Sequence, residues 1–232
     1  MSVAGDSDVA RSAAPLAGVR AVVFDLDGTL VDSMPLVLRA FAHALAPFRP
    51  EMTLNDIFQR LGGPPVRMML ELIGDESKAA EAMRRLESFG FEDGSQVQPF
   101  TGMQELLVAL RSRGLLLAIW TGRDRGTTQA ILSAHGLGSF FTVMVCGDDL
   151  PTHKPHPAGL IEILRKLDLR SGEVLYVGDA DADVLGGAGA GVPTILIRHD
   201  RREDEAITAK AWRSVGLPAD AYALIRTTLL EK

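Results

Sequence analysis

The sequence predicts an α/β fold, in which a parallel sheet is covered on both faces by helices and interrupted by a smaller, all-helical insertion. Short apolar runs alternate with segments of helical periodicity, which is the pattern of repeated βαβ units. The runs are almost continuously apolar, which indicates strands buried on both sides. Residues 34–98 instead carry helical patterns and no convincing strand. We therefore expect one sheet-based core with a helical insertion.

Five apolar runs are the predicted strands of the core. They cover residues 19–24, 115–120, 141–145, 173–177 and 194–197. Helices are predicted between them at residues 103–113, 127–135 and 158–167. Gly114 and Gly136 directly follow the first two helices, at the position where a glycine commonly ends a helix.

The insertion lies between the first and second predicted strands. Its edges, "DSMP" and "QVQPFTG", contain the Pro and Gly that are typical of connecting segments. We expect a core of residues 18–33 and 99–232 and a helical domain of residues 34–98. Residues 1–17 are expected to be a loose tail. The segment from 203 to 232 is expected to form two helices separated by a turn near Gly216.

Composition narrows the classes of function. A formal net charge of −6 excludes a general attraction to nucleic-acid backbones or anionic membranes. The single cysteine, Cys146, excludes an intramolecular disulfide and a multi-cysteine zinc site. The start of the chain does not resemble a secretory signal, and no apolar run approaches the roughly 20 residues that cross a bilayer. We expect a cytoplasmic protein with no nucleic-acid or membrane partner.

Asp25 and Asp27 directly follow the first predicted strand, in "VVFDLDGTLVDS". Side chains at i and i+2 of an extended chain point the same way and lie about 6.6 Å apart. The two carboxylates therefore border one small space, while Leu26 turns into the core. Ligands of open parallel sheets bind beyond the carboxyl ends of the strands. A phosphoryl group would fit between these carboxylates.

Later strands are expected to bring phosphate-binding groups to the same edge. Thr121 and Gly122 follow the second predicted strand and offer a hydroxyl and helix-start amides to an anion. Lys154, in the loop "GDDLPTHKPHP", can supply a fixed positive charge.

Further carboxylates at this edge predict a metal. Asp179 follows the fourth predicted strand, and Asp183 lies on the same face four residues later if a helix begins there. Asp25, Asp27 and Asp179 would repel one another by up to ~4 kcal/mol per pair at 4 Å and an effective dielectric of 20. All-oxygen ligands with room for water and substrate phosphate suit magnesium. The sequence therefore predicts a Mg²⁺ site.

Four elements in this order, "DLDGTL", Thr121 after an apolar strand, Lys154-Pro155 and "GDADAD", resemble the haloacid dehalogenase superfamily of aspartate-nucleophile phosphohydrolases. The match spans about residues 19–197. The resemblance implies a Rossmann-like, doubly wound core. The insertion resembles the helical cap of phosphoglycolate phosphatase-like and β-phosphoglucomutase-like members. The implied function is a magnesium-dependent phosphatase that acts on a small phosphorylated metabolite, such as a sugar phosphate or a phosphoglycolate-like compound.

The resemblance also implies roles for individual residues. Asp25 would be the nucleophile that forms an aspartyl-phosphate, and Asp27 would protonate the leaving oxygen and later activate water. The implied metal ligands are Asp25, the backbone carbonyl of Asp27, Asp179 and, in a supporting position, Asp183. The residues expected to bind the transferring phosphoryl group are Thr121, Gly122 and Lys154.

Two positions depart from the pattern of the family. Ala180 stands where Ser is common, and the additional Asp181 leaves open whether Asp181 or Asp183 supports the metal, with Asp183 favoured. Arg123 follows the Thr-Gly pair, where many relatives carry other residues. It either touches the substrate or lies exposed at a helix start.

The insertion is expected to determine the substrate. In its loop "QRLGGPPVR", Arg60 and Arg67 are expected to bind an anionic substrate that Gly62-Gly63 approaches, unless both arginines are solvated helix ends. A phosphomutase that uses the same core residues stays open as an alternative. A catalytically silent interaction module is a further, less favoured interpretation. The sequence leaves open both the substrate and whether the protein is a monomer or a homodimer.

Overall fold

The computed structural model describes residues 16, 18–60, 65–89, 94–199 and 204–231. Within these residues, six parallel strands form one sheet in the order β5-β4-β1-β6-β7-β8. The strands are β1 (Ala21–Phe24), β4 (Leu116–Trp120), β5 (Val143–Val145), β6 (Val174–Gly178), β7 (Thr194–Ile197) and β8 (Arg213–Val215). All five predicted strands are present, and the predicted α/β class is confirmed.

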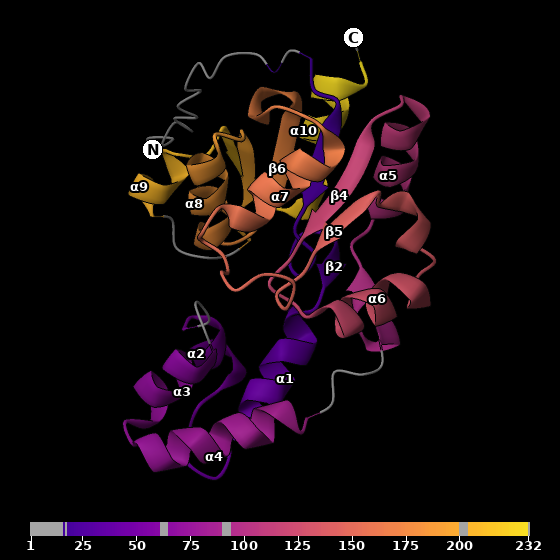
Figure 1. The fold of residues 1–232 in the computed structure, drawn as a ribbon. Helices are drawn as coiled ribbons and strands as arrows, with labels where there is room; N and C mark the ends of the chain where they lie inside the picture. The colour runs from indigo at the N-terminus through magenta and orange to yellow at the C-terminus, as the bar shows by residue number, and fades with distance from the viewer. Residues whose placement is uncertain (1–15, 17, 61–64, 90–93, 200–203, 232) are drawn as a thin grey trace, which may run out of the picture.

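Helices cover both faces of the sheet (Figure 1). They are α5 (Met103–Ser112), α6 (Arg125–Ala134), α7 (Ala158–Leu167), α8 (Asp181–Ala190) and α10 (Pro218–Leu229). Val22 and Phe24 of β1 face a hydrophobic cluster shared with α5, α6 and α10. Ala21 and Val23 face the opposite cluster, which α7 completes. Because successive residues of β1 point to opposite faces and both faces are covered, the whole strand is apolar.

In the part of the insertion that the structure describes, four helices pack on one another. They are α1 (Met34–Leu45), α2 (Leu54–Phe58), α3 (Pro65–Ile73) and α4 (Glu76–Glu87). They enclose a hydrophobic cluster of their own, which includes Phe41 and Met69. Figure 1 shows this group at one end of the molecule, joined to the sheet through β2 (Val31–Asp32). We call these four helices the helical group.

Three short strands were not predicted. β2 pairs antiparallel with β3 (Gln98–Pro99), and two residues are too few to produce a periodic pattern. β8 lies at the edge of the sheet, beside β7, in the tail that was predicted to be helix, turn and helix. The helix-turn-helix prediction is therefore wrong for these three residues. They are all partly exposed, so this edge strand shows no apolar run in the sequence. The helices of this tail are α9 (Glu205–Thr208) and α10.

Two expectations fall outside the described residues, namely the loose tail over most of residues 1–17 and the approach of Gly62-Gly63 to the substrate. In the part of the chain that the structure describes, no helix combines the length and the apolar character needed to cross a bilayer.

Candidate active site

Asp25 lies at the carboxyl end of β1, where the central ladder of the sheet holds its backbone. Its N–H donates to the carbonyl oxygen of Val177 in β6 at 2.8 Å. The residue is 6% exposed, and its Oδ1 lies 2.7 Å from Nζ of Lys154. Burial raises the pKa of this carboxyl well above its usual range, Lys154 opposes the rise, and three neighbouring aspartates add to it. The strand end therefore carries a buried carboxyl that needs nearby positive charge to ionise.

Gly28 brings the loop after β1 against Asp179, the residue that follows β6. Its φ of +73° lies in the left-handed region, and a Cβ built on it would lie 2.3 Å from Oδ2 of Asp179. A side chain would be strained by the backbone angle and would collide with the carboxylate. The close approach places the loop of Asp25 and Asp27 beside the end of the neighbouring strand.

Asp25, Asp179 and Asp183 form a buried group whose geometry fits a divalent cation. One carboxylate oxygen from each residue lies within 4.8 Å of the other two. Buried carboxylates this close repel one another unless a cation offsets their charge. Hard oxygen donors are the ligands that magnesium prefers. The carboxyl of Asp27 is not part of this group. The predicted ligand from Asp27 is its backbone carbonyl oxygen, and that contribution stays a prediction.

Asp183 has protein partners on both of its carboxylate oxygens. Oδ1 accepts the hydroxyl of Tyr176 at 2.6 Å and lies 2.7 Å from Nζ of Lys154. Oδ2 accepts the backbone N–H of Ala180 at 2.9 Å, at the start of α8. Asp181 is exposed on the same helix turn. Asp183 therefore helps to fix the position of Lys154, whether or not it also binds a metal.

Lys154 rests on two aromatic rings. Its Nζ lies 5.0 Å from the ring centroid of Trp120 and 5.5 Å from that of Tyr176. A Cβ at Gly159 or Gly186 would lie 2.1 Å or 2.5 Å from the Trp120 ring, so these glycines allow α7 and α8 to pack against it. Burial lowers the pKa of the ammonium, but the two carboxylates it contacts outweigh that effect and the pKa is raised. The lysine is therefore charged and fixed.

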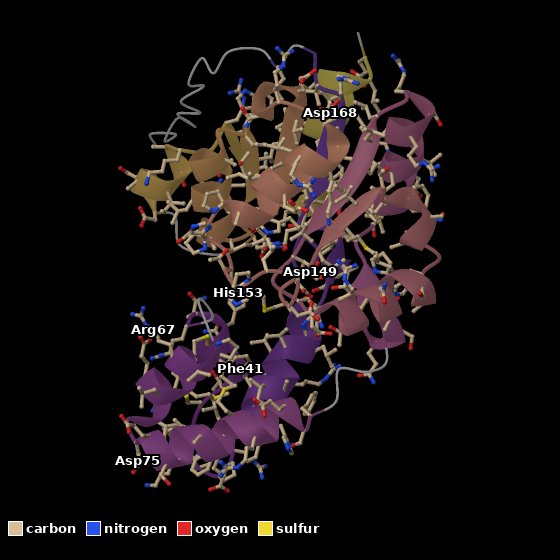
Figure 2. All side chains as sticks on the ribbon, in the orientation of Figure 1. Phe41, Arg67, Asp75, Asp149, His153 and Asp168 are labelled. Atoms are coloured by element: carbon tan, nitrogen blue, oxygen red, sulfur yellow. The ribbon has the colours of Figure 1, made fainter. Side chains whose placement is uncertain are left out.

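Thr121 and Gly122 follow β4 at the adjacent strand end. The backbone N–H of Thr121 donates to Val145 of β5 at 3.1 Å, and its Oγ1 accepts the N–H of Arg123 at 3.1 Å. A hydroxyl that accepts one hydrogen bond can donate its own hydrogen to a phosphoryl oxygen. Thr121, Gly122 and Lys154 line one small hollow. The loop that carries the lysine lies at the end of the sheet that faces the helical group, as the label on the preceding histidine shows (Figure 2).

Asp27 and Arg123 form a two-pronged ion pair. Nε of Arg123 donates to Oδ2 at 2.9 Å, and Nη2 donates to Oδ1 at 2.6 Å. The arginine side chain is 12% exposed and that of the aspartate 31%. Burial raises the pKa of Asp27, but the charge and hydrogen bonds of Arg123, with a hydrogen bond from Ser33, outweigh it and the pKa is lowered. Arg123 is thus a largely buried partner of Asp27, not an exposed residue at a helix start.

Arg60, which follows α2, and Arg67, in α3, each contact a residue four positions away in the insertion. Nη1 of Arg60 donates to the carbonyl oxygen of Asp56 at 2.9 Å. Arg67, with a side chain that is 77% exposed, pairs with Glu71 at 2.7 Å. Figure 2 shows Arg67 at the outer edge of the helical group. These contacts do not bring either arginine to the acidic edge, and their role in substrate binding stays a prediction.

Three residues beside the site were not predicted: Trp120, Tyr176 and His199. The two aromatic residues lie inside apolar strands, where the sequence suggests packing alone, although Trp120 directly precedes Thr121. His199 follows β7 with a φ of +52°, and its Nε2 lies 2.7 Å from the carbonyl oxygen of Gly28. The sequence signal that could have identified Tyr176 is its hydroxyl group, in a strand whose other side chains are aliphatic or absent.

Three features together define a class of hydrolases with a Rossmann-like core. They are the parallel sheet, the two aspartates that follow β1, and the lysine that contacts the first of these aspartates. The family model described as haloacid dehalogenase-like hydrolase matches residues 22–197. The chain belongs to this family. The resemblance read from the four motifs is thereby confirmed.

Relatives with known names are similar over most of the chain. A phosphoglycolate phosphatase of Yersinia pseudotuberculosis is 34% identical over 199 residues, which cover 82% of this chain and 85% of that protein. The pyrophosphatase PpaX of Halalkalibacterium halodurans is 30% identical over 190 residues, covering 82% and 88%. The solved structure of a predicted phosphoglycolate phosphatase from Haemophilus somnus is 25% identical, covers 90% of this chain and 99% of that one, and has a TM-score of 0.76.

A structure provisionally assigned to the β-phosphoglucomutases, from Thermotoga maritima, shares the fold. Its TM-score is 0.71 at 22% identity, with 90% of this chain and 100% of that chain covered. At this level of identity the likeness concerns the fold alone.

Proposed function

We propose that this chain is a magnesium-dependent phosphatase that hydrolyses a small phosphorylated metabolite through a phosphorylated Asp25. The observation that carries the proposal is the buried contact of 2.7 Å between Nζ of Lys154 and Oδ1 of Asp25, with Asp179 beside it. A fixed ammonium at a strand-end carboxylate is suited to hold a phosphoryl group against a nucleophile. The named phosphoglycolate phosphatase and pyrophosphatase relatives support phosphoryl chemistry.

Two half-reactions follow from this arrangement. A carboxylate oxygen of Asp25 attacks phosphorus, and the bond from phosphorus to the leaving oxygen breaks as Asp27 transfers its proton to that oxygen. Asp27, now ionised, then takes a proton from water, the water oxygen attacks phosphorus, and the bond to Asp25 breaks to release inorganic phosphate. Thr121, Gly122 and Lys154 hold the phosphoryl oxygens in both steps and offset their charge.

Magnesium fits the donor set described above. Asp25, Asp179 and the backbone carbonyl of Asp27 would hold it, with Asp183 in support. When bound, the ion supplies positive charge that polarises the phosphoryl group. It would also favour the ionised form of Asp25, whose pKa burial raises well above its usual range.

We also propose that residues 34–98 act as a cap over a core of residues 18–33 and 99–232. The separate hydrophobic cluster of the helical group and its position at the end of the sheet to which β2 leads support this division (Figure 1). A cap at the carboxyl ends of the strands would exclude bulky macromolecular substrates. It would also bring Arg60 and Arg67 within reach of an anionic substrate when it closes.

A panel of phosphorylated compounds tests the function. Phosphate release is measured from p-nitrophenyl phosphate, 2-phosphoglycolate, pyrophosphate and β-glucose 1-phosphate, with Mg²⁺ and with EDTA. We expect release that requires Mg²⁺, falls by about 10³-fold or more in Asp25→Asn, and is retained in the exposed control Asp181→Asn. Conversion of β-glucose 1-phosphate to glucose 6-phosphate without phosphate release would assign a mutase. No turnover of any compound would leave a non-catalytic interaction module.

A further inference from the structure

His199 holds a backbone carbonyl of the loop that carries the proposed nucleophile. Its Nε2 lies 2.7 Å from the carbonyl oxygen of Gly28, a partner 171 positions away in the chain. A carbonyl oxygen only accepts hydrogen bonds, so this nitrogen carries a hydrogen and donates it. We propose that His199 is a positioning residue for the proposed magnesium site, which it keeps assembled by holding Gly28 beside Asp179. The inference rests on the proposed function.

Gly28 is the point at which two segments with expected metal ligands touch. The first segment is the loop after β1, in which Gly28 directly follows Asp27. The second is the end of β6, where Oδ2 of Asp179 would lie 2.3 Å from a Cβ built on Gly28. The carbonyl of Asp27, an expected ligand, belongs to the same rigid peptide unit as the nitrogen of Gly28. A shift of Gly28 therefore moves that carbonyl and also changes the space left for the carboxylate of Asp179.

The imidazole provides a donor that the backbone does not. Gly28 is buried, and no backbone N–H of the described residues donates to its carbonyl oxygen. The next part of the turn is held by its own backbone, because the N–H groups of Leu30 and Val31 donate to the carbonyl of Leu26 at 2.9 and 3.1 Å. A buried carbonyl without a donor is unfavourable. Removing the imidazole therefore favours a loop position in which the Gly28 carbonyl finds another donor.

The surroundings of His199 fix its ring in this direction. His199 lies two residues after β7, the strand beside β6, and its φ of +52° is in the left-handed region. Residues other than glycine rarely adopt this angle, and they keep it where the surrounding structure holds them. The imidazole lies against Phe100, with ring centroids 5.9 Å apart. The N–H of Phe100 donates to the carbonyl of Leu30 at 3.0 Å, so the residue that supports the ring contacts the same loop.

Two amide side chains of different length separate positioning from a structural role. The side chain of Gln extends about as far from the backbone as Nε2 of His and ends in an N–H, whereas that of Asn is one methylene shorter. Asn adopts a left-handed φ more readily than most residues do. A purely structural role therefore predicts that His199→Asn is the better substitute. Positioning of Gly28 predicts that His199→Gln is.

The test measures Mg²⁺ binding by titration calorimetry without substrate, and phosphate release from p-nitrophenyl phosphate at saturating Mg²⁺. We expect His199→Ala to raise the Kd for Mg²⁺ by about 10- to 100-fold, the loss typical of residues that orient metal ligands without contacting the metal. We expect kcat to fall more than KM changes, because the reacting groups are displaced. His199→Gln should restore most of the affinity, and His199→Asn should not.

Two controls match the changes made. Asp168→Ala places an alanine at nearly the same backbone angle, a φ of +53°, on an exposed residue at the end of the core away from the helical group (Figure 2). Tyr222→Phe removes a hydroxyl that donates at 2.6 Å to the next carbonyl of the loop, that of Thr29. Both variants should lose stability, measured as Tm in EDTA, and keep the wild-type Kd for Mg²⁺.

Three results would overturn the inference while the proposed function stands, provided that the wild-type protein binds Mg²⁺ and releases phosphate. They are an unchanged Kd in His199→Ala, an equal rise of Kd in Tyr222→Phe, and a lower Kd in His199→Asn than in His199→Gln. No Mg²⁺ binding by the wild-type protein would reject the magnesium-dependent function and this inference together. If His199→Ala does not fold, the comparison of the Gln and Asn variants decides.

Discussion

Tyr176 donates its hydroxyl hydrogen to Asp183 at 2.6 Å, and the accepting oxygen is the one that also lies 2.7 Å from Nζ of Lys154. Both Tyr176 and Asp183 are almost fully buried. Burial raises the pKa of Tyr176 well above its usual range, and the negative charges of Asp183 and Asp25 add to the rise. The phenol therefore keeps its hydrogen and acts as a donor. A tyrosine inside the sheet thus orients the carboxylate that fixes the site lysine.

Tyr176→Phe removes this donor and leaves the ring in place. Because Oδ1 of the buried Asp183 loses a partner, we expect the free energy of unfolding to fall by about 1–3 kcal/mol. We also expect kcat for phosphate release to fall more than KM changes, since Lys154 is less well fixed. Urea unfolding and steady-state kinetics measure the two effects.

Tyr222→Phe is the matched control for this variant. The Tyr222 hydroxyl donates at 2.6 Å to the carbonyl oxygen of Thr29 and is also buried, but it does not contact Asp183 or Lys154. We expect it to lose stability and to retain its turnover per folded molecule. Full stability and activity in Tyr176→Phe would contradict the role given to the tyrosine.

Gly28→Ala should be far more damaging than an alanine at another left-handed glycine. The new Cβ would lie 2.3 Å from Oδ2 of Asp179, in addition to the strain of a φ of +73°. At Gly114, with a φ of +78°, a Cβ meets nothing within 4 Å, so Gly114→Ala should lose only about 1–2 kcal/mol of stability. We expect phosphate release to fall by about 100-fold or more in Gly28→Ala, because Asp179 must move. Similar kinetics in the two variants would show that the close approach does not matter.

The fold was largely predictable because the strands of a parallel sheet are buried on both faces and leave continuous apolar runs. β8 left no such signal, since Arg213–Val215 is a partly exposed edge strand. At the site, the sequence shows which polar residues follow strands, and the structure brings Asp25 and Asp179 together accordingly. The sequence could not show that Arg123 turns toward Asp27. The two residues are 96 positions apart, and a contact between them depends on the order of the strands and on the direction of each side chain.

Glu173 gives a prediction for the dependence of stability on pH. Hydrogen bonds from the backbone and the side chain of Arg170, with one from Arg20, lower the pKa of its carboxyl to about 2. A carboxyl whose pKa is lower in the folded state stabilises the fold above the unfolded pKa, near 4.3, and loses that contribution as the pH falls toward 2. Glu173→Gln should therefore show a shallower loss of stability between about pH 5 and pH 3. Urea midpoints across this range measure it, and parallel curves for the two proteins would refute it.

Magnesium should stabilise the folded protein through the acidic group, whether or not a substrate has been identified. An ion that binds only the native state at a hundredfold excess over its Kd adds about 2.7 kcal/mol, which corresponds to a rise of roughly 5 °C or more in Tm for a chain of this size. We expect Asp179→Asn to abolish the rise and the exposed control Asp181→Asn to retain it, with Tm measured in Mg²⁺ and in EDTA.

Asp183→Asn separates the two roles that Asp183 could have, namely metal binding and fixing Lys154. Because both oxygens of Asp183 already have protein partners, we expect this variant to lose activity and keep most of the rise in Tm. A rise lost equally in Asp183→Asn would instead make Asp183 a metal ligand, and one retained in Asp179→Asn would move the ion away from this group.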